Sequence, residues 1–341
     1  MALLTERSLV NAGKREDLAN LIALVDAKDT PFTSMAKKGA EPGNTLFRWQ
    51  ADRLPSTSAP TPVVDGSDIS AYDNYTVDGA TQYRCELSNR VQIFRKAVRV
   101  SKLTQSSVTN VAGVRDELSN NVSKAITLIK REMEVAMCSA QGAQVDNGTV
   151  GYRTRGLDKW IVAAASIDTV DLPAAAADFC PSAAQISTVG TASLTESVVQ
   201  NVLTGIYTQT GQFKNYDAIV GPTLKRAFTN LVFTTPSTGS TNTQNTIRTL
   251  TRDATEPTYI SSVDVFEGDF GQIRLHPSLF LKNNFSGYII PFDMLEVRYG
   301  GNVAEVTELP NAGGGEARLV EAVAGLCVYN PLAFGKFDFS A

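Results

Sequence analysis

Apolar residues recur at helical spacing over residues 114–141, and this pattern predicts one long amphipathic helix. Its apolar stripe consists of Leu118, Val122, Ala125, Ile126, Ile129, Met133, Ala136 and Met137. At about 1.5 Å per residue the helix would span on the order of 40 Å. Gly142 is expected to cap its C-terminus. A helix with a single apolar face needs a partner layer, so we expect it to pack against a sheet.

A polar segment that cannot bury a core of its own precedes this helix. From Leu54 to Tyr83 the chain has no Lys or Arg, and it is rich in Pro, Ser and Thr. Its carboxylates include Asp65, Asp68, Asp73 and Asp78. Residues 45–53 and 81–100 are predicted to be the outgoing and returning strands of a long two-stranded loop. An isolated hairpin is marginal in water, so we expect another surface to hold this loop.

The base of the loop has the opposite charge from its tip. Residues 84–102 contain one acid, Glu86, among many cations. The candidate interface cations are Arg84, Arg90, Arg95, Lys96 and Arg99. An acidic tip and a basic base in one chain favour head-to-tail contact, in which the tip of one subunit meets the base of the next. The alternative is that these charges are simply solvated.

The first 44 residues form a leading arm in this interpretation. Residues 16–27 have a short helical pattern with one apolar face, made of Leu18, Leu21, Ile22 and Val25. Pro31 is expected to end this helix, because the residue before a proline disfavours the helical region. Gly39, Pro42 and Gly43 indicate a turn.

Residues 148–290 have the pattern of an α/β unit. A capping box at 193–196 is predicted to open a helix, a buried strand at 216–220 follows, and a second helix covers 223–232. Residues 263–266 and 271–275 are predicted to form a hairpin.

Strands return after residue 292. Residues 295–299 are predicted to turn at Gly300 and Gly301 into a partner strand at 303–306. The glycines at 313–315 are expected to form a hairpin tip before a long apolar strand at 319–329. Separate helical and strand-rich segments around one long helix indicate an α+β fold.

Composition excludes some classes of function. The net charge is −4 and the pI is near 5.3, which argues against nucleic-acid binding as the main task. A container for nucleic acid remains compatible with this charge. The N-terminus lacks the pattern of a signal peptide, and no window reaches the roughly 18 apolar residues of a membrane span. We therefore expect no membrane contact and assembly in the cytoplasm.

The inventory of reactive side chains is nearly empty. His276 is the only histidine, so a hydrolase would have to use it. The four cysteines at 85, 138, 180 and 327 form no metal-binding or redox pair, and Cys138 and Cys327 are expected to be buried. Asp264, Glu267 and Asp269 fit no calcium loop. Arg153 and Arg155 near Trp160 are a weak phosphate-binding candidate. We predict no catalytic residue, no metal and no cofactor.

Several short strings occur in the order seen in one family. They are 29–34 (DTPFTS), 93–101 (IFRKAVRVS), 117–118 (EL), 130–134 (KREME), 154–157 (TRGL), 194–196 (LTE), 220–222 (VGP) and 269–271 (DFG). On these strings the chain resembles tailed-phage major capsid proteins with the HK97 fold, and more narrowly those of the phage SU10 type. The strings are each weak, but together they cover nearly the whole chain.

The resemblance implies names for the parts of the chain. They are an N-arm at 1–44, an extended E-loop at 45–96, a peripheral domain with the spine helix at 97–148, an axial domain at 149–291 and peripheral return strands at 292–341. It also implies pentamers and hexamers in an icosahedral shell around double-stranded DNA, bound without sequence specificity, and a portal as partner. The alternatives are an encapsulin-like nanocompartment shell and, from another class, a hydrolase using His276.

The chain departs from some relatives in two ways. It begins directly in the arm, so a scaffolding protein is expected either to be a separate chain or not to be needed. It has no Lys between Lys38 and Lys96, so the E-loop lysine that joins subunits by an isopeptide bond in some relatives is absent. Stability is then expected from noncovalent burial or from a separate cement protein.

Overall fold

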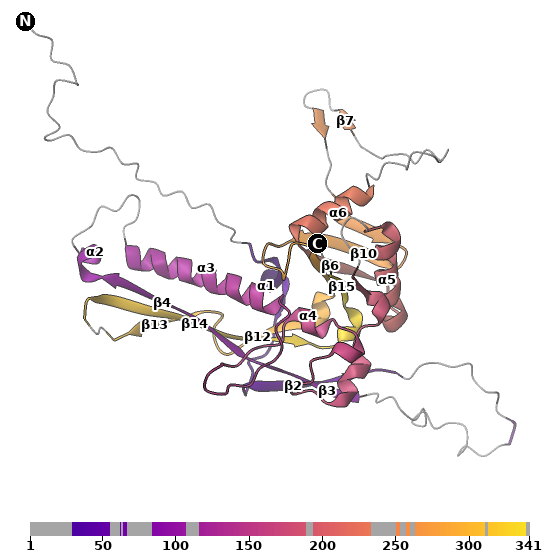
Figure 1. The fold of residues 1–341 in the computed structure, drawn as a ribbon, viewed down its shortest axis with the longest axis horizontal. Helices are drawn as coiled ribbons and strands as arrows, with labels where there is room; N and C mark the ends of the chain where they lie inside the picture. The colour runs from indigo at the N-terminus through magenta and orange to yellow at the C-terminus, as the bar shows by residue number, and fades with distance from the viewer. Residues whose placement is uncertain are drawn as a thin grey trace, which may run out of the picture.

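The computed structural model describes residues 29–54, 62, 64–66, 84–106, 116–188, 194–232, 250–252, 257–259, 263–310 and 313–338. The described chain forms two large sheets, which lie at different ends of an elongated molecule, and two small two-stranded sheets (Figure 1). A long helix, α3 (Glu117–Met137), runs along the first sheet, whereas α5 (Glu196–Thr210) and α6 (Pro222–Val232) pack on the second. This arrangement agrees with the predicted α+β class.

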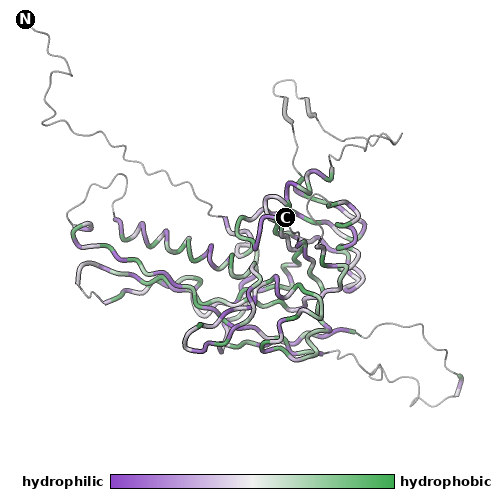
Figure 2. The backbone as a smooth tube through the Cα atoms, in the orientation of Figure 1, coloured by the Kyte–Doolittle hydropathy of each residue, from purple (hydrophilic) through white to green (hydrophobic). Residues whose placement is uncertain are grey.

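The predicted long helix is confirmed, but it begins three residues later and ends four residues earlier than predicted. It spans α3 (Glu117–Met137), and the side chain of its N-cap Asp116 accepts a hydrogen bond from the Leu118 amide at 2.9 Å. Hydrophobic and hydrophilic positions alternate along it (Figure 2), and the apolar face is buried against the sheet. The prediction that Gly142 caps this helix is wrong. Cys138 is the C-cap, and the Ser139 hydroxyl donates to Ala136 O at 2.8 Å within the last turn.

The first sheet is built around one long strand. Its members are β1 (Lys37–Lys38), β12 (Leu295–Tyr299), β14 (Gly315–Val328), β13 (Glu305–Leu309) and β4 (Gln92–Ser101). β4 pairs along one edge of β14, while β12 and β13 follow one another along the other edge. The predicted hairpin at Gly300 and Gly301 is therefore wrong. The Gly300 amide instead donates to Val323 O at 2.9 Å, which keeps the chain on the same edge.

The predicted glycine hairpin tip is confirmed between β13 and β14. Gly313, Gly314 and Gly315 all have positive φ, at 91°, 84° and 143°. A Cβ on Gly315 would lie 1.9 Å from Val100 O of β4, so this position has no room for a side chain.

The second sheet has six strands. In spatial order they are β5 (Ile186–Ser187), β15 (Gly335–Asp338), β11 (Ser286–Ile290), β6 (Lys214–Val220), β10 (Gly271–Pro277) and β9 (Val265–Gly268). The predicted strand at 216–220 and the hairpin of β9 and β10 are confirmed. Residues 292–341 were all expected to belong to the first sheet. β15 instead pairs with β11 and β5 of the second sheet.

Two helices of the second sheet begin close to their predicted starts. They are α5 (Glu196–Thr210) and α6 (Pro222–Val232). The predicted capping box is wrong: Thr195 is the N-cap of α5, and its side chain makes no capping hydrogen bond. Apolar residues of α5 and α6 share a core with strands β6 and β10.

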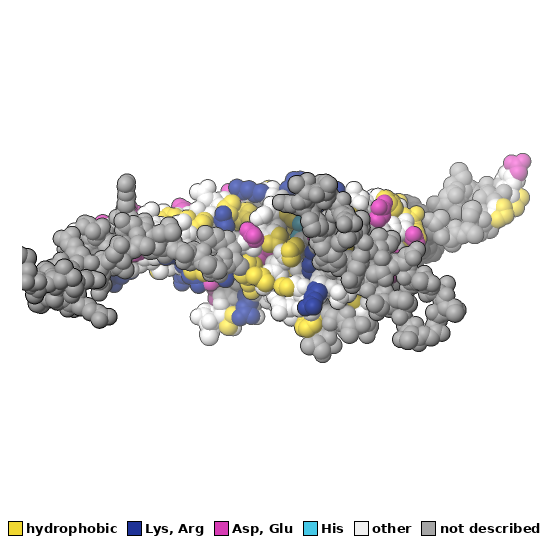
Figure 3. Space-filling view, turned by 90° about the horizontal axis from the view of Figure 1, so that it is seen from above, with side chains coloured by type: hydrophobic (Ala, Val, Ile, Leu, Met, Phe, Trp, Pro, Cys, Tyr) yellow, Lys and Arg dark blue, Asp and Glu magenta, His cyan; other side chains and the backbone are white. Residues whose placement is uncertain are grey.

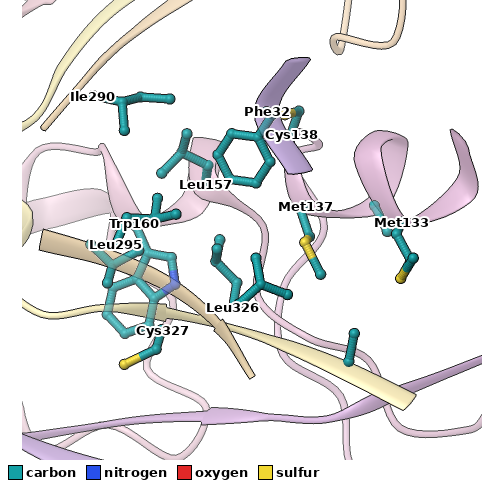
Figure 4. Close-up of a cluster of buried hydrophobic side chains, with 14 of the residues drawn as sticks. Phe32, Met133, Met137, Cys138, Leu157, Trp160, Ile290, Leu295, Leu326 and Cys327 are labelled. Atoms are coloured by element: carbon teal, nitrogen blue, oxygen red, sulfur yellow. The ribbon is translucent and has the colours of Figure 1, made fainter. Parts of the chain in front are cut away.

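A larger core joins the first sheet and α3 to apolar residues of several short elements. Figure 4 shows Phe32, Met137, Trp160 and Cys327 converging from separate parts of the chain. A buried polar contact also links Asp158, whose neighbours Leu157 and Trp160 belong to this core, to the second sheet. Asp158 accepts hydrogen bonds from Tyr288 of β11 and Lys336 of β15, both at 3.1 Å.

The remaining elements are short. They are α1 (Pro31–Met35), β2 (Leu46–Asp52), β3 (Arg84–Arg90), α2 (Lys102–Ser106), α4 (Leu157–Trp160), β7 (Leu250–Arg252), β8 (Pro257–Tyr259) and the 3-10 helices η3 (Ala164–Ser166), η4 (Ala174–Phe179), η5 (Ala183–Gln185), η7 (Phe292–Met294) and η8 (Pro331–Ala333). The returning strand of the loop was predicted as one strand over 81–100. The structure divides it at Val91, whose amide donates to Thr45 O at 3.0 Å, so β3 and β4 belong to different sheets.

Candidate subunit interface

The base of the long loop packs on the subunit's own core. Along β2, burial alternates, so that Phe47, Trp49 and Ala51 face inward. The Trp49 ring lies 5.6 Å from the Trp160 ring of α4. The expectation that another surface holds the whole loop is therefore wrong for its base. The alternation of apolar and polar residues at 47–51 was the signal in the sequence that could have shown this.

Arg155 holds β3, at the base of the loop, in place from the buried side. Its side chain is fully buried, its guanidinium lies 4.8 Å from the Trp160 ring, and it donates to Ser88 O of β3 at 3.0 Å. An ion pair of 3.3 Å joins it to Asp168. Burial lowers the pKa of Arg155, and Asp168 opposes that effect. A buried guanidinium cannot reach a phosphate, so the weak phosphate-binding candidate is wrong for Arg155.

Arg90 also has a partner within the subunit. Its Nε lies 2.5 Å from Asp171 Oδ2, and both side chains are largely buried. The hydrogen bond from Arg90 lowers the pKa of Asp171 and raises that of Arg90. The predicted interface role of Arg90 has no support here, because its charge is already compensated inside the subunit.

The other predicted interface cations lie nearer the surface. Arg84 pairs with Asp52 at 3.0 Å, and Lys96 pairs with Glu132 of α3 at 2.5 Å. Within the described ranges, the exposed Arg95 has no ion-pair partner. Figure 3 shows basic and apolar side chains lying next to each other on one face of the molecule. These surface cations are accessible to a neighbouring chain.

The remaining interface candidates concern the hairpin tip and the loop tip. Arg99 donates to Gly313 O at the hairpin tip of β13 and β14. Asp65 is exposed. Asp68, Asp73 and Asp78 lie outside the described residues, so contact between the loop tip and the base stays a prediction.

The arm is attached to the long helix by a buried carboxylate that the sequence reading missed. Glu134 of α3 accepts hydrogen bonds from the amides of Phe32 at 2.9 Å and Thr33 at 2.7 Å, at the start of α1. Burial raises the pKa of Glu134, while these hydrogen bonds lower it to a smaller extent. Pro31 is the first residue of α1. The predicted helix at 16–27 lies outside the described residues.

The reactive side chains show no assembled chemical site in the described part of the chain. His276 Nε2 lies 3.0 Å from Asp217 Oδ1, which is a pair without a third member. Among the residues that the structure describes, no three His, Cys, Asp or Glu side chains group as metal ligands. All four cysteines are buried and free, and burial raises the pKa of Cys180 to about 11 and of Cys327 to about 12. None of the described helices has both the length and the apolar character needed to cross a membrane.

The fold defines the class of protein. A long helix on a sheet, a loop anchored at its base, an arm and an α/β unit make an HK97-like capsid fold. The structure is similar to a solved structure described as the "Cyanophage A-1(L) capsid asymmetric unit", with a TM-score of 0.61, 13% identity, and coverage of 99% of this chain and 100% of that chain. The SrpI encapsulin of Synechococcus elongatus has a TM-score of 0.51 and 11% identity, over 100% of this chain and 97% of that one.

Sequence comparison identifies the family. The model of the SU10 major capsid protein family matches residues 5–339, and the chain belongs to that family. The major capsid protein of Escherichia phage Phieco32 is 36% identical over 129 residues, which is 38% of this chain. The match spans 34% of the length of that relative.

Proposed function

We propose that this chain is the major capsid protein of a tailed phage and self-assembles into an icosahedral shell around double-stranded DNA. The observation that supports this most directly is the family match over residues 5–339. The net charge of −4 is consistent with a container that does not bind its contents tightly. The proposed location is the virion capsid, after assembly in the host cytoplasm.

Assembly proceeds by mutual burial of surfaces in this proposal. Each subunit lays its loop and arm over its neighbours, and burial contributes roughly 25 cal/mol per Å² before ordering costs. Contacts that are weak singly become stable when every subunit makes several. A portal and separate scaffolding or cement proteins would complete the particle.

Electron microscopy of the purified full-length chain tests the proposal. Closed shells with fivefold and sixfold clusters of subunits are the expected result. A protein that stays monomeric under all assembly conditions, with and without co-expressed scaffold, would contradict it.

A nanocompartment shell is the second candidate, because the fold is also similar to that of the SrpI encapsulin. The contents of particles purified from their natural source distinguish the two. Nuclease-protected double-stranded DNA supports the capsid, whereas an enclosed enzyme without DNA supports the compartment.

The family is one of structural proteins, and we propose that the chain has no catalytic activity. A hydrolase would have to use His276, whose neighbour Asp217 could orient the ring. Assays of His276→Ala for hydrolysis and for particle formation separate the roles. Loss of a measured hydrolytic activity with normal particles would favour the enzyme.

A further inference from the structure

An apolar groove lies between β4 and the solvent-exposed side of α3. It encloses about 680 Å³. Large apolar side chains line it although they are exposed: Ile93 at 53%, Leu128 at 43% and Val135 at 46%. The Phe280 ring, 5.1 Å from the Arg131 guanidinium, also lines the groove. Exposed apolar residues gathered in one groove indicate a surface that is covered in the working protein.

We propose that the groove receives residues 16–27 of another copy of this chain, as an amphipathic helix; this rests on the proposed function. The apolar face of that segment runs from Leu18 to Val25, and the groove apolars of α3 run from Leu128 to Val135. In both cases the first and last residues are seven positions apart, or about 10.5 Å along a helix. The two faces therefore match in length, and helix-in-groove docking uses this spacing.

Charge complements the apolar match. Residues 16–27 contain Glu16, Asp17 and Asp26 and no Lys or Arg. On a helix, Asp17 and Asp26 flank the apolar face on opposite sides. The groove has an arginine on each rim, Arg95 on β4 and Arg131 on α3. Its acid, Glu132, is already paired with Lys96 at 2.5 Å. A docked segment would bring one carboxylate toward each arginine.

The position of α1 argues that the segment comes from another copy. Asp29, the first described residue, lies near Lys130 and Met133 of α3. These two residues are on the opposite side of α3 from the groove. Val25 can lie at most about 14 Å from Asp29, whereas half the circumference of a helix 10–12 Å wide is about 16–19 Å.

The segment that contains Ser278 and Phe280 obstructs the same path. Ser278 hydrogen-bonds Glu134 on the arm side of α3, and the Phe280 ring contacts Arg131 on the groove side. Val25 of the same chain therefore falls short of the groove along this path, which favours a second copy as the source of the docked helix.

Disulfide cross-linking between copies tests the docking. Full-length chains with Ile22→Cys alone and with Val135→Cys alone are mixed, assembled and oxidised. The expected product is a covalent pair of chains, formed several-fold more than with the control Val265→Cys. The side chain of Val265 is 45% exposed, nearly the same fraction as that of Val135, but Val265 lies on β9 in the second sheet. The native thiols are buried, which keeps the background low.

The outcomes separate the docking from the proposed function. Shells that form without the cross-link, or with equal yield for the control, overturn the docking and leave the capsid proposal standing. A chain with both substitutions that links only to itself also overturns it. Failure of the unsubstituted chain to form shells overturns both.

A second variant checks the energetics. Val135→Asp should lower shell yield several-fold, because it puts a charge among the apolar side chains that the docked helix would cover. Val265→Asp should leave the yield unchanged. Equal yields from the two variants would contradict the docking.

Discussion

Glu134 shows how one buried side chain can position a whole segment. Its carboxylate accepts hydrogen bonds from two backbone amides at the start of α1. This helix has only five residues and would not be stable in isolation. The arm thus leaves the body of the subunit at a defined place on α3.

Replacing this carboxylate tests its role. Glu134→Ala leaves two buried amides without an acceptor, so we expect the free energy of unfolding to fall by about 1–3 kcal/mol. Urea unfolding followed by circular dichroism measures it. Glu132→Ala removes an exposed ion pair on the same helix and should cost less than about 1 kcal/mol. Equal losses in the two variants would show that the hydrogen bonds contribute little.

The pair of Arg90 and Asp171 predicts a pH dependence. Arg90 lowers the pKa of Asp171 in the folded chain, so the unfolded state binds the proton at higher pH. The pair stabilises the fold above the unfolded pKa of Asp, about 3.9, and this contribution is lost as pH falls through the lower folded pKa. Unfolding measured from pH 6 to pH 3 should show a weaker acid dependence in Asp171→Asn.

Asn suits this substitution because Asp171 has a φ of 60°, which Asn tolerates. Asp293→Asn, in an exposed pair with Lys214, is the control and should keep the dependence of the natural chain. An unchanged acid dependence in Asp171→Asn would contradict the prediction.

At the scale of elements, β2 and β3 form a rigid root for the loop. Trp49 packs between Phe47 and Trp160, with ring distances of 5.8 and 5.6 Å. The loop therefore starts from the subunit's own core, and only its outer part needs a neighbour.

Truncation at this root should be costly. We expect Trp49→Ala to lower the free energy of unfolding by about 3–5 kcal/mol, since it opens a cavity among aromatic rings. Trp49→Phe keeps a ring and removes an indole N–H that has no hydrogen-bond partner, so its cost should stay below about 1.5 kcal/mol. Thermal unfolding of both variants measures this. Similar losses would point to a specific need for the indole.

Elements with a strong periodic pattern were predictable, and those fixed by distant contacts were not. The stripe of α3 and the hairpin of β9 and β10 are local signals. The glycines at 300–301 resemble a hairpin turn, but the length of β14 decides that both short strands pair with it. The partners of Arg90 and Glu134 lie 81 and about 100 residues away, so a single sequence could not reveal them.

At the scale of the whole molecule, charge separation between loop tip and base predicts an assembly defect. Changing Asp65, Asp68, Asp73 and Asp78 to Lys should impair shell formation. The loop tip would then be positively charged and would repel the cations at the loop base of the next subunit. Circular dichroism should show an intact helical signal, since α3, α5 and α6 lie outside the loop. Particle yield by electron microscopy measures the defect.

A matched control makes the same charge change elsewhere. Glu41, Glu267, Asp269 and Glu305 are exposed acids outside the loop tip. Changing these four to Lys should affect assembly less than the loop variant. Normal particles from the loop variant, or an equal defect in the control, would retire contact between tip and base without affecting the fold.

The pairing of β4 with β14 has a mechanical consequence. All ten residues of β4 pair in register with β14, and β4 follows directly after the loop root. In a shell under internal pressure, a neighbouring subunit would pull on the loop. The force would act along β4, so the backbone hydrogen bonds between β4 and β14 would resist it together. Rupture should then occur where shell subunits meet before any single subunit unravels.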